Sequence, residues 1–299
     1  MLAAMTENAE TRRERAARRA GEFPPAPEPL PLPVIDSHTH LDITVSEAGA
    51  PGPATIDDPV ARVIAIAAEV GVNRLVQVGV DLPSSQWGAE LATRHPAVVA
   101  TVALHPNDAP RLPDLDEALR GIEALAAQER VRGIGETGMD FFRTGEDGRA
   151  AQEASFRAHI AIAKRYGKPL VIHDRDAHAE VLRILDDEGA PETVVLHCFS
   201  GDAEFATECV DRGYLLSFAG TVTFASAAGL REAAKVTPPE LMLVETDAPY
   251  LTPTPHRGRP NASYLIPLTV RALAETTGRG VDELCAAISD NGERVFGPW

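Results

Sequence analysis

The feature that most constrains the fold is a regular alternation, from residue 34 onward, of short apolar runs with longer amphipathic stretches. The apolar runs are typical of buried β-strands, and they cover residues 34–35, 74–80, 98–104, 131–135, 169–172, 193–196, 214–218 and 241–245. Helical patterns lie between most of them, at residues 58–69, 115–127, 150–166, 177–188 and 203–211. Eight strands with helical crossovers in about 265 residues predict an α/β fold, a single-domain (β/α)8 TIM barrel.

Glycines along the chain agree with this interpretation. Four of them lie just past the ends of helical stretches, where a left-handed cap is favoured: Gly71, Gly167, Gly189 and Gly213. Two more helical patterns, at residues 266–277 and 281–289, follow the last strand and are expected to complete the outer layer. A doubly wound open sheet is the alternative, but no glycine-rich dinucleotide fingerprint follows the first strand.

Residues 1–33 differ in composition from the rest and are expected to be a flexible N-terminal extension of a domain covering residues 34–299. The extension begins with a basic cluster of Arg12, Arg13, Arg15, Arg18 and Arg19. Six prolines then alternate between residues 24 and 33, which is typical of an extended spacer. A nucleic-acid-binding arm and a disordered tail are both compatible with this composition, and no role is assigned to it.

The first strand carries a candidate metal-binding pair, His38 and His40. Residues two apart in an extended strand point to the same face, so both imidazoles would project into one space. Converging imidazoles are typical ligands of borderline divalent cations. Surface or core histidines at this spacing are also common, so the pair alone does not decide the matter.

Further ligand-type residues recur where later strands end, at Glu136, His173, His197 and Asp247. The C-terminal ends of barrel strands form one rim, which carries the active site in TIM-barrel enzymes. We therefore expect two divalent cations, one held by His38, His40 and Asp247 and the other by His173 and His197, with Glu136 bridging them. Such a pair can clamp the oxygens of a displacement at phosphorus, and Asp247 would accept a proton from the attacking water. Any of these residues alone could be a structural polar group at a strand end.

Five motifs carry a family resemblance: residues 36–42 (DSHTHLD), 135–140 (GETGMD), 172–175 (IHDR), 197–201 (HCFSG) and 245–251 (ETDAPYL). Together with residues 255–261 and 291–296, they resemble the TatD family of metal-dependent deoxyribonucleases over about residues 34–297. The resemblance implies a TIM barrel of the amidohydrolase superfamily with His38, His40, Glu136, His173, His197 and Asp247 as metal ligands. It also implies a 3′→5′ exonuclease that often prefers single strands and commonly uses Mg²⁺. Asn107 stands where family members often have histidine, which leaves the substrate contacts there open.

Three residues are candidates for substrate binding: His105, Arg175 and Arg257. His105 follows the third strand and would either contact a scissile phosphate or cap the following turn. Arg175 lies two residues after His173 and would either fork onto a phosphate or pair with a neighbouring carboxylate. Arg257 lies in a loop rich in proline and glycine, where it would contact phosphate or stay solvated. Phe141 and Phe142 would either stack on a nucleobase or pack beneath their loop.

Charge and cysteine content narrow the class of protein. A formal net charge of −16 argues against non-specific coating of nucleic acid, although bound cations can meet a phosphate locally. Three widely spaced cysteines and the lack of a long apolar run predict a cytoplasmic protein without a membrane partner. The family resemblance implies DNA or RNA ends as the substrate and two divalent ions as the cofactor, with Mg²⁺, Mn²⁺ and Zn²⁺ as candidates. Two alternatives remain: a hydrolase of a small lactone, amide or phosphotriester, and a non-catalytic protein with a structural metal.

Overall fold

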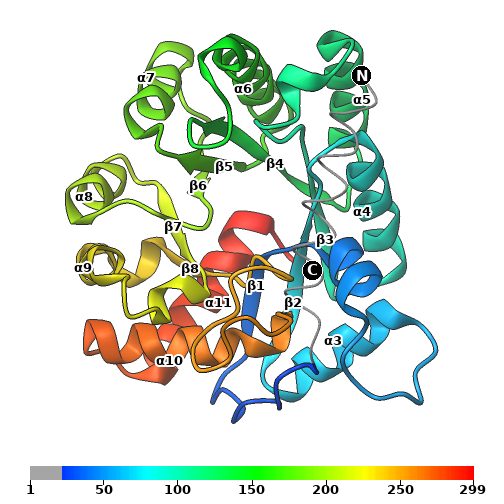
Figure 1. The fold of residues 1–299 in the computed structure, drawn as a ribbon, viewed down its shortest axis with the longest axis vertical. Coiled ribbons are helices and arrows are strands. Elements are labelled where there is room, and N and C mark those ends of the chain that lie inside the picture. Colours follow the sequence, from blue (N-terminus) through cyan, green and yellow to red (C-terminus); the bar gives the residue numbers. More distant parts are fainter. Residues whose placement is uncertain (1–21) are drawn as a thin grey trace.

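Eight parallel β-strands pair in sequence order in the computed structural model, which describes residues 22–299 (Figure 1). Their bounds are β1 Val34–Thr39, β2 Val72–Val78, β3 Val98–Val102, β4 Val131–Asp140, β5 Leu170–Arg175, β6 Val194–Leu196, β7 Leu215–Phe218 and β8 Met242–Val244. A parallel bridge between Thr39 and Ala248 joins the first strand to the chain just beyond the last. The predicted barrel is thus confirmed, and its closing seam lies beside His38 and His40.

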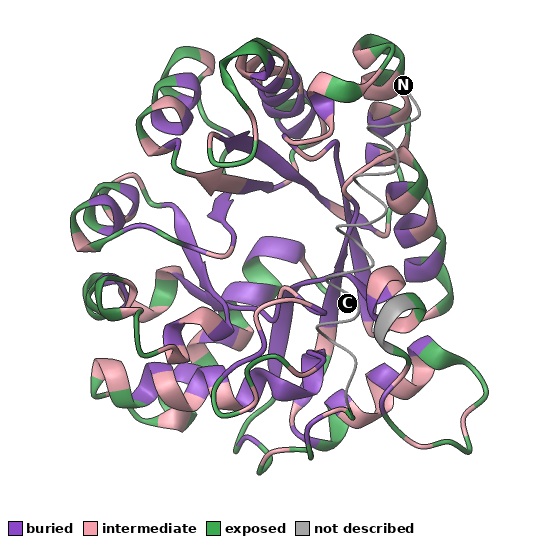
Figure 2. Cartoon of the chain, viewed as in Figure 1, coloured by how far each residue is buried: buried purple, intermediate pink, exposed green. Residues whose placement is uncertain are grey.

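Helices form a ring around the strands (Figure 1). The longer ones are α3 Pro59–Glu69, α4 Leu82–Arg94, α5 Leu115–Ala126, α6 Glu146–Tyr166, α7 His178–Glu188, α8 Ala203–Asp211, α9 Ala228–Val236, α10 Ile266–Thr277 and α11 Val281–Phe296. Short turns complete the outer layer at α2 Leu41–Ile43, η1 Thr44–Ala48, η2 Ala109–Arg111, η3 Gly220–Thr223, η4 Pro239–Leu241 and η5 Ser263–Leu265. The strands are buried almost throughout, because the barrel interior covers one face and the helices the other (Figure 2).

Aspartates begin many of these helices. The carboxylates of Asp58, Asp81, Asp114 and Asp202 each accept a hydrogen bond from a backbone N–H in the first turn. These bonds satisfy donors that a helix start would otherwise leave unpaired. At the other end, the four glycines predicted as caps all have positive φ, and Gly167 is a left-handed cap at φ 58°.

Several predicted bounds were too short, and two helices were not predicted. Strand β4 continues to Asp140 instead of ending at residue 135, and β5 continues to Arg175. Helix α11 runs on to Phe296, seven residues past its predicted end. The unpredicted helices are α4, which contains Pro83, two serines and Gly88, and the nine-residue α9. The helical pattern of α4 is weak because such residues lower intrinsic helix propensity.

A glycine in β4 explains why the strand can continue. A Cβ atom built on Gly138 would stand 2.1 Å from the carbonyl oxygen of His173 on β5, and Gly138 has φ +133°. Only glycine combines that backbone conformation with so close an approach. Two glycines close together in sequence, Gly135 and Gly138, are typical of a turn. Here Gly138 instead allows the ends of β4 and β5 to approach each other.

Residues 22–33, which we call the proline strap, lie against the barrel. Arg259 donates to the carbonyls of Glu22 and Phe23 at 2.9 and 3.0 Å, and the Tyr264 hydroxyl donates to the carbonyl of Pro24 at 2.6 Å. Further along, the backbone N–H of Leu30 donates to Val70 at 3.0 Å. This part of the predicted flexible extension is therefore docked, while the basic cluster of Arg12 to Arg19 lies outside the described residues.

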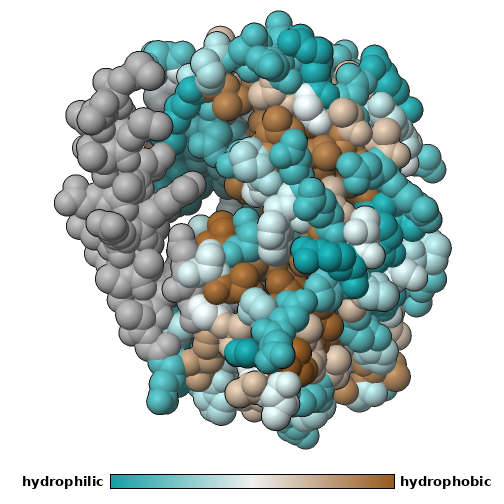
Figure 3. Space-filling model, turned by 90° about the vertical axis from the view of Figure 1, so that its right-hand side faces the viewer, coloured by the Kyte–Doolittle hydropathy of each residue, from teal (hydrophilic) through white to brown (hydrophobic). Residues whose placement is uncertain are grey.

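The described surface is mixed in character. On the face drawn in Figure 3, which is the right-hand side of Figure 1, hydrophilic side chains are interspersed with apolar ones. Within residues 22–299, the large apolar side chains that are mainly exposed are Leu32, Phe142 and Val236. No helix in the same range is long and apolar enough to cross a membrane.

Candidate metal centre

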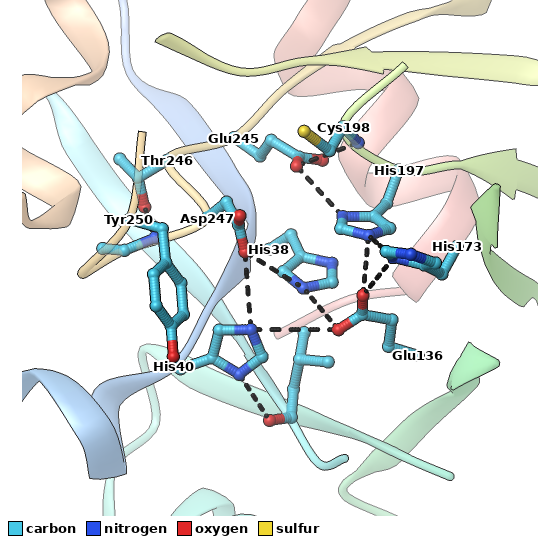
Figure 4. Close-up of polar contacts among 12 residues, drawn as sticks. His38, His40, Glu136, His173, His197, Cys198, Glu245, Thr246, Asp247 and Tyr250 are labelled. Atoms are coloured by element: carbon cyan, nitrogen blue, oxygen red, sulfur yellow. Dashed lines mark hydrogen bonds and ion pairs between the residues drawn. The ribbon is translucent and has the colours of Figure 1, made fainter. Parts of the chain in front are cut away.

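Glu136 lies at the centre of a cluster of histidines at the C-terminal rim of the barrel (Figure 4). Its Oε1 atom lies 2.8 Å from His173 Nδ1, 2.9 Å from His197 Nε2 and 3.3 Å from His105 Nε2. Its Oε2 atom lies 3.5 Å from His38 Nε2 and 3.9 Å from His40 Nε2. The two oxygens of one carboxylate therefore face two separate groups of imidazoles.

Asp247 completes the group around His38 and His40. Its Oδ1 atom lies 3.4 Å from His40 Nε2 and 3.8 Å from His38 Nε2. Asp247 has φ +51°, a left-handed conformation that is uncommon for a residue with a side chain. The seam of the barrel holds it there, since its N–H donates to the carbonyl of His38 at 2.9 Å.

Asp36 stabilises the seam between β1 and the segment that follows β8. Its fully buried carboxylate accepts hydrogen bonds from the N–H and the hydroxyl of Thr246, at 2.9 and 2.6 Å. Asn261 donates its side-chain amide to the carbonyl of Thr246 at 3.0 Å. Burial raises the pKa of Asp36 to about 7, and the hydrogen bonds from Thr246 oppose that rise. Asp36 thus ties β1 to the segment that presents Asp247.

Backbone and carboxylate acceptors orient two of the imidazoles. His40 donates from Nδ1 to the carbonyl of Val78 at 3.2 Å, which leaves Nε2 facing Asp247 and Glu136. His197 donates from Nδ1 to Glu245 Oε1 at 3.1 Å, so its Nε2 faces Glu136. Such outer partners fix the tautomer and the ring orientation of metal-binding histidines.

Sequence reasoning missed Glu245 and Asp140. Glu245 is fully buried and also accepts the N–H of Cys198 at 3.0 Å, while Asp140 Oδ2 lies 3.3 Å from His173 Nε2. Alternation along a longer β4 would have indicated Asp140, because residues 136, 138 and 140 share one face of a continuous strand. Asn107, which stands where family members often have histidine, donates a hydrogen bond to Asp140 at 2.8 Å.

The electrostatics of the cluster reflect many buried carboxylates and imidazoles. Burial opposes charge on Glu136, but the neighbouring His197 and His105 hold its pKa well below the usual range. Burial likewise opposes charge on His40, but Asp247 raises the pKa of His40 to about 9. Burial and the charge of His197 lower the pKa of His38. At neutral pH Glu136 and Asp247, whose pKa values are both lowered, are therefore ionised, and they attract positive charge into the rim.

Among residues 22–299, three sets of side chains have ligand atoms close enough to hold a metal ion, all atoms of a set lying within 4.8 Å of one another. The sets are His38 with His40 and Asp247, His105 with Glu136 and His173, and His38 with His197 and Glu245. Neither ring nitrogen of the buried His38 has a hydrogen-bond partner among residues 22–299. Buried polar atoms without partners are costly, and a cation at Nε2 would satisfy this one. The donor set therefore fits divalent metal ions.

The candidate substrate residues divide into two groups. His105 belongs to the cluster, and its Nδ1 accepts the N–H of Asn107 at 3.0 Å. Because that lone pair is used, the proton of the ring lies on Nε2, which faces Glu136. Arg175 and Arg257 instead cover aromatic rings, with their guanidinium carbons 4.1 Å from the centre of the Phe142 ring and 4.0 Å from that of Phe224. Of the two alternatives for Arg175, the structure shows no pairing with a carboxylate among residues 22–299, and contact with a phosphate stays a prediction.

Comparison with known proteins gives the family of the chain. The sequence profile of the family described as TatD related DNase matches residues 35–297. An uncharacterized metal-dependent hydrolase, TatD, of Mycobacterium tuberculosis is 48% identical over 266 residues, which covers 88% of this chain and 97% of the relative. The 3′-5′ ssDNA/RNA exonuclease TatD of Citrobacter rodentium is 37% identical over 245 residues, covering 79% and 91% of the two chains.

Among solved structures, the TatD homolog YJJV of Escherichia coli superposes with a TM-score of 0.79 at 25% identity. That alignment covers 88% of this chain and 97% of the other. Three observations therefore agree on the family: the eight-stranded barrel, the rim of imidazoles around Glu136, and the matches over nearly the whole chain. The chain belongs to the family of TatD related DNases and is a metal-dependent hydrolase.

Proposed function

We propose that this protein hydrolyses phosphodiester bonds in nucleic acids, as a 3′→5′ exonuclease acting on single-stranded ends of DNA or RNA. The observation that carries the proposal is the placement of Glu136, whose two oxygens face two different groups of imidazoles at 2.8–3.9 Å. A carboxylate that bridges two cations needs this arrangement. Related proteins named as 3′-5′ ssDNA/RNA exonucleases support the choice of substrate.

The assignment of ligands is part of the proposal. His38, His40 and Asp247 would hold one ion, His173 and His197 would hold the other, and Glu136 would bridge them. Mg²⁺, Mn²⁺ and Zn²⁺ are the candidates, since imidazoles suit Zn²⁺ whereas carboxylates suit Mg²⁺ and Mn²⁺. Two such ions supply Lewis-acid charge on the phosphate and lower the pKa of the attacking water.

The residues of the chain supply the remaining chemistry. Burial opposes charge on Asp247, but its contact with His40 lowers its pKa, so the carboxylate is ionised and accepts the proton of the attacking water. His105 presents the N–H of Nε2 toward the same space, where it donates a hydrogen bond to a phosphate oxygen. Glu136 keeps its charge at neutral pH, which suits a bridging ligand and not a proton donor.

A metal add-back experiment tests the proposal. Metal-stripped protein is incubated with single-stranded DNA labelled at the 3′ or the 5′ end, and Mg²⁺, Mn²⁺ or Zn²⁺ is added separately. We expect stepwise shortening from the 3′ end that depends on the ion and is lost in Glu136→Gln. The exposed Glu192, changed to glutamine, is the matched control and should retain activity.

Metal content separates the ligand assignment from the choice of substrate. Equilibrium dialysis followed by metal analysis should give two ions per chain for the wild type and fewer for Glu136→Gln. If two ions bind but neither DNA nor RNA is cleaved with any of the three ions, the proposed substrate class is wrong. Lactones, amides and phosphotriesters are then the next substrates to assay. If Glu136→Gln binds two ions and cleaves normally, the bridging role is wrong.

A further inference from the structure

An exposed aromatic ring stands beside the proposed catalytic rim. Phe142 is 62% exposed, although exposing a large apolar side chain to water is unfavourable. Its neighbour Phe141 is half-buried, packs against the core and lies under the guanidinium of Arg149 at 3.9 Å. The two adjacent phenylalanines therefore have different surroundings, and only Phe141 is explained by packing.

The position of Phe142 follows from residues of the candidate metal centre. It lies two residues after Asp140, whose carboxylate is 3.3 Å from His173. Arg175 covers the ring at 4.1 Å and lies two residues after His173 on the paired strand. Two residues span at most about 7 Å of chain, so ring and guanidinium lie on the rim next to the site.

The loop that carries Phe142 is held in place. Asp140 Oδ1 accepts the N–H of Arg143 at 2.8 Å, and the Phe141 N–H donates to the carbonyl of Arg175 at 2.9 Å. Thr144 donates to Asn107 at 2.9 Å, and Asn107 in turn donates to Asp140. The ring is thus presented from a fixed backbone. A fixed flat surface loses little conformational freedom when a ligand stacks on it.

We infer that Phe142 and Arg175 form a stacking subsite for an unpaired nucleobase next to the phosphate that is cleaved. The inference rests on the proposed function and extends it to the choice between single and double strands. A base in a duplex has both faces covered by its neighbours, whereas an unpaired base can stack on an aromatic ring. The guanidinium adds a positive charge near the adjacent phosphate, and it can stack on a base as well.

A second pair of the same kind supports this ligand class. Arg257 covers Phe224 at 4.0 Å, and these residues come from the loops that follow β8 and β7. Arginine over phenylalanine thus occurs beside β4 and β5, at Phe142 and with Arg149 at Phe141, and again beside β7 and β8. Aromatic and basic side chains together are typical of proteins that bind single strands.

The test measures binding without hydrolysis. Fluorescence anisotropy in the presence of a chelator compares a labelled oligothymidylate with the same strand carrying abasic sites at its last three 3′ positions. We expect Phe142→Ala to weaken binding of the normal strand by roughly 5- to 150-fold, the range typical of one lost stacking contact. Binding of the abasic strand should be equally weak in both proteins, and Phe142→Tyr should restore preference for the normal strand.

Val236→Ala is the matched control, because Val236 is also exposed but ends α9 at the face opposite the rim. If wild type binds normal and abasic strands equally, or Phe142→Ala weakens both equally, the stacking subsite is wrong. Hydrolysis is assayed separately with added metal ions. A protein that shows the expected difference in binding yet cleaves no strand would overturn the proposed function, while Phe142 and Arg175 would remain a binding site for an unpaired base.

Discussion

His159 offers a quantitative test of how the loop after β3 is supported. This fully buried side chain accepts the N–H of Leu104 at Nε2, at 3.1 Å, and donates from Nδ1 to the carbonyl of Ser155 at 2.7 Å. Both bonds are possible only for the neutral ring, because a second proton would face the N–H of Leu104. Burial lowers the pKa of His159 to about 4.

The sign and size of the effect follow from proton linkage. In the unfolded chain, histidine takes up a proton below about pH 6.5, whereas the folded protein resists it until about pH 4. Acid therefore favours the unfolded chain, and this contribution to stability is lost as the pH falls through that window. Between pH 7.5 and pH 4.5 the loss amounts to about 2.5 kcal/mol.

Urea unfolding followed by circular dichroism, at pH 7.5 and pH 4.5 with a chelator present, measures this loss. Other groups also titrate in that range, so the relevant quantity is the difference between wild type and His159→Gln. We expect the free energy of unfolding to fall by about 2.5 kcal/mol more in wild type than in the variant. Equal losses in the two proteins would refute the assignment of a buried neutral histidine.

Three further predictions concern the strap, the strand pairing and the metal ions. Tyr264→Phe removes the donor to the carbonyl of Pro24 and should lower the free energy of unfolding by about 1–2 kcal/mol, measured by urea titration; an unchanged midpoint would count against a docked strap. Gly138→Ala should cost more than about 3 kcal/mol or abolish folding, because the added methyl would overlap the carbonyl of His173, and soluble protein with native stability would contradict the close approach. A metal ion must displace the proton that the raised pKa of about 9 keeps on His40, so metal affinity should rise about tenfold per pH unit for each proton displaced. Calorimetric titrations at pH 6 and pH 8 that give equal affinities would show that no proton is displaced.

Periodicity was sufficient for the architecture because each barrel strand and each outer helix follows its own local pattern. Helix α10 was predicted with the bounds that the structure has, and the end of α3 was predicted as well. Burial on both faces makes barrel strands continuous apolar runs, which are easy to detect. The same property hides their ends, since polar residues that continue a strand onto the rim look like the start of a loop.

The candidate site was predicted in part for the same reason. His38 and His40 were identified from alternation within one strand, whereas Asp140 was missed because β4 was expected to end before it. Glu245 reaches His197 across 48 positions of chain, and no local pattern indicates which of two nearby carboxylates turns to that ring. The left-handed backbone of Asp247 breaks the alternation there, so its side chain could not be placed by counting. The role of these residues as ligands stays a prediction.

The proline strap was misjudged because composition says nothing about distant partners. Alternating prolines predict an extended chain, and the strap is extended, but whether such a chain packs depends on donors elsewhere. Those donors, Arg259 and Tyr264, lie more than 200 positions away. A chain without N–H groups at its prolines still offers carbonyl oxygens, and Arg259 and Tyr264 donate to these atoms.

The docked strap also decides where this protein can be shortened. The family profile begins at residue 35, which suggests a recombinant chain that starts at β1. Such a chain would lose the acceptor of the Tyr264 hydroxyl, which is fully buried, and both acceptors of the Arg259 guanidinium. Arg259 lies in the loop that also carries Arg257, so this loop would lose its contacts with the strap. A fusion tag, a label or a protease site therefore belongs before residue 22.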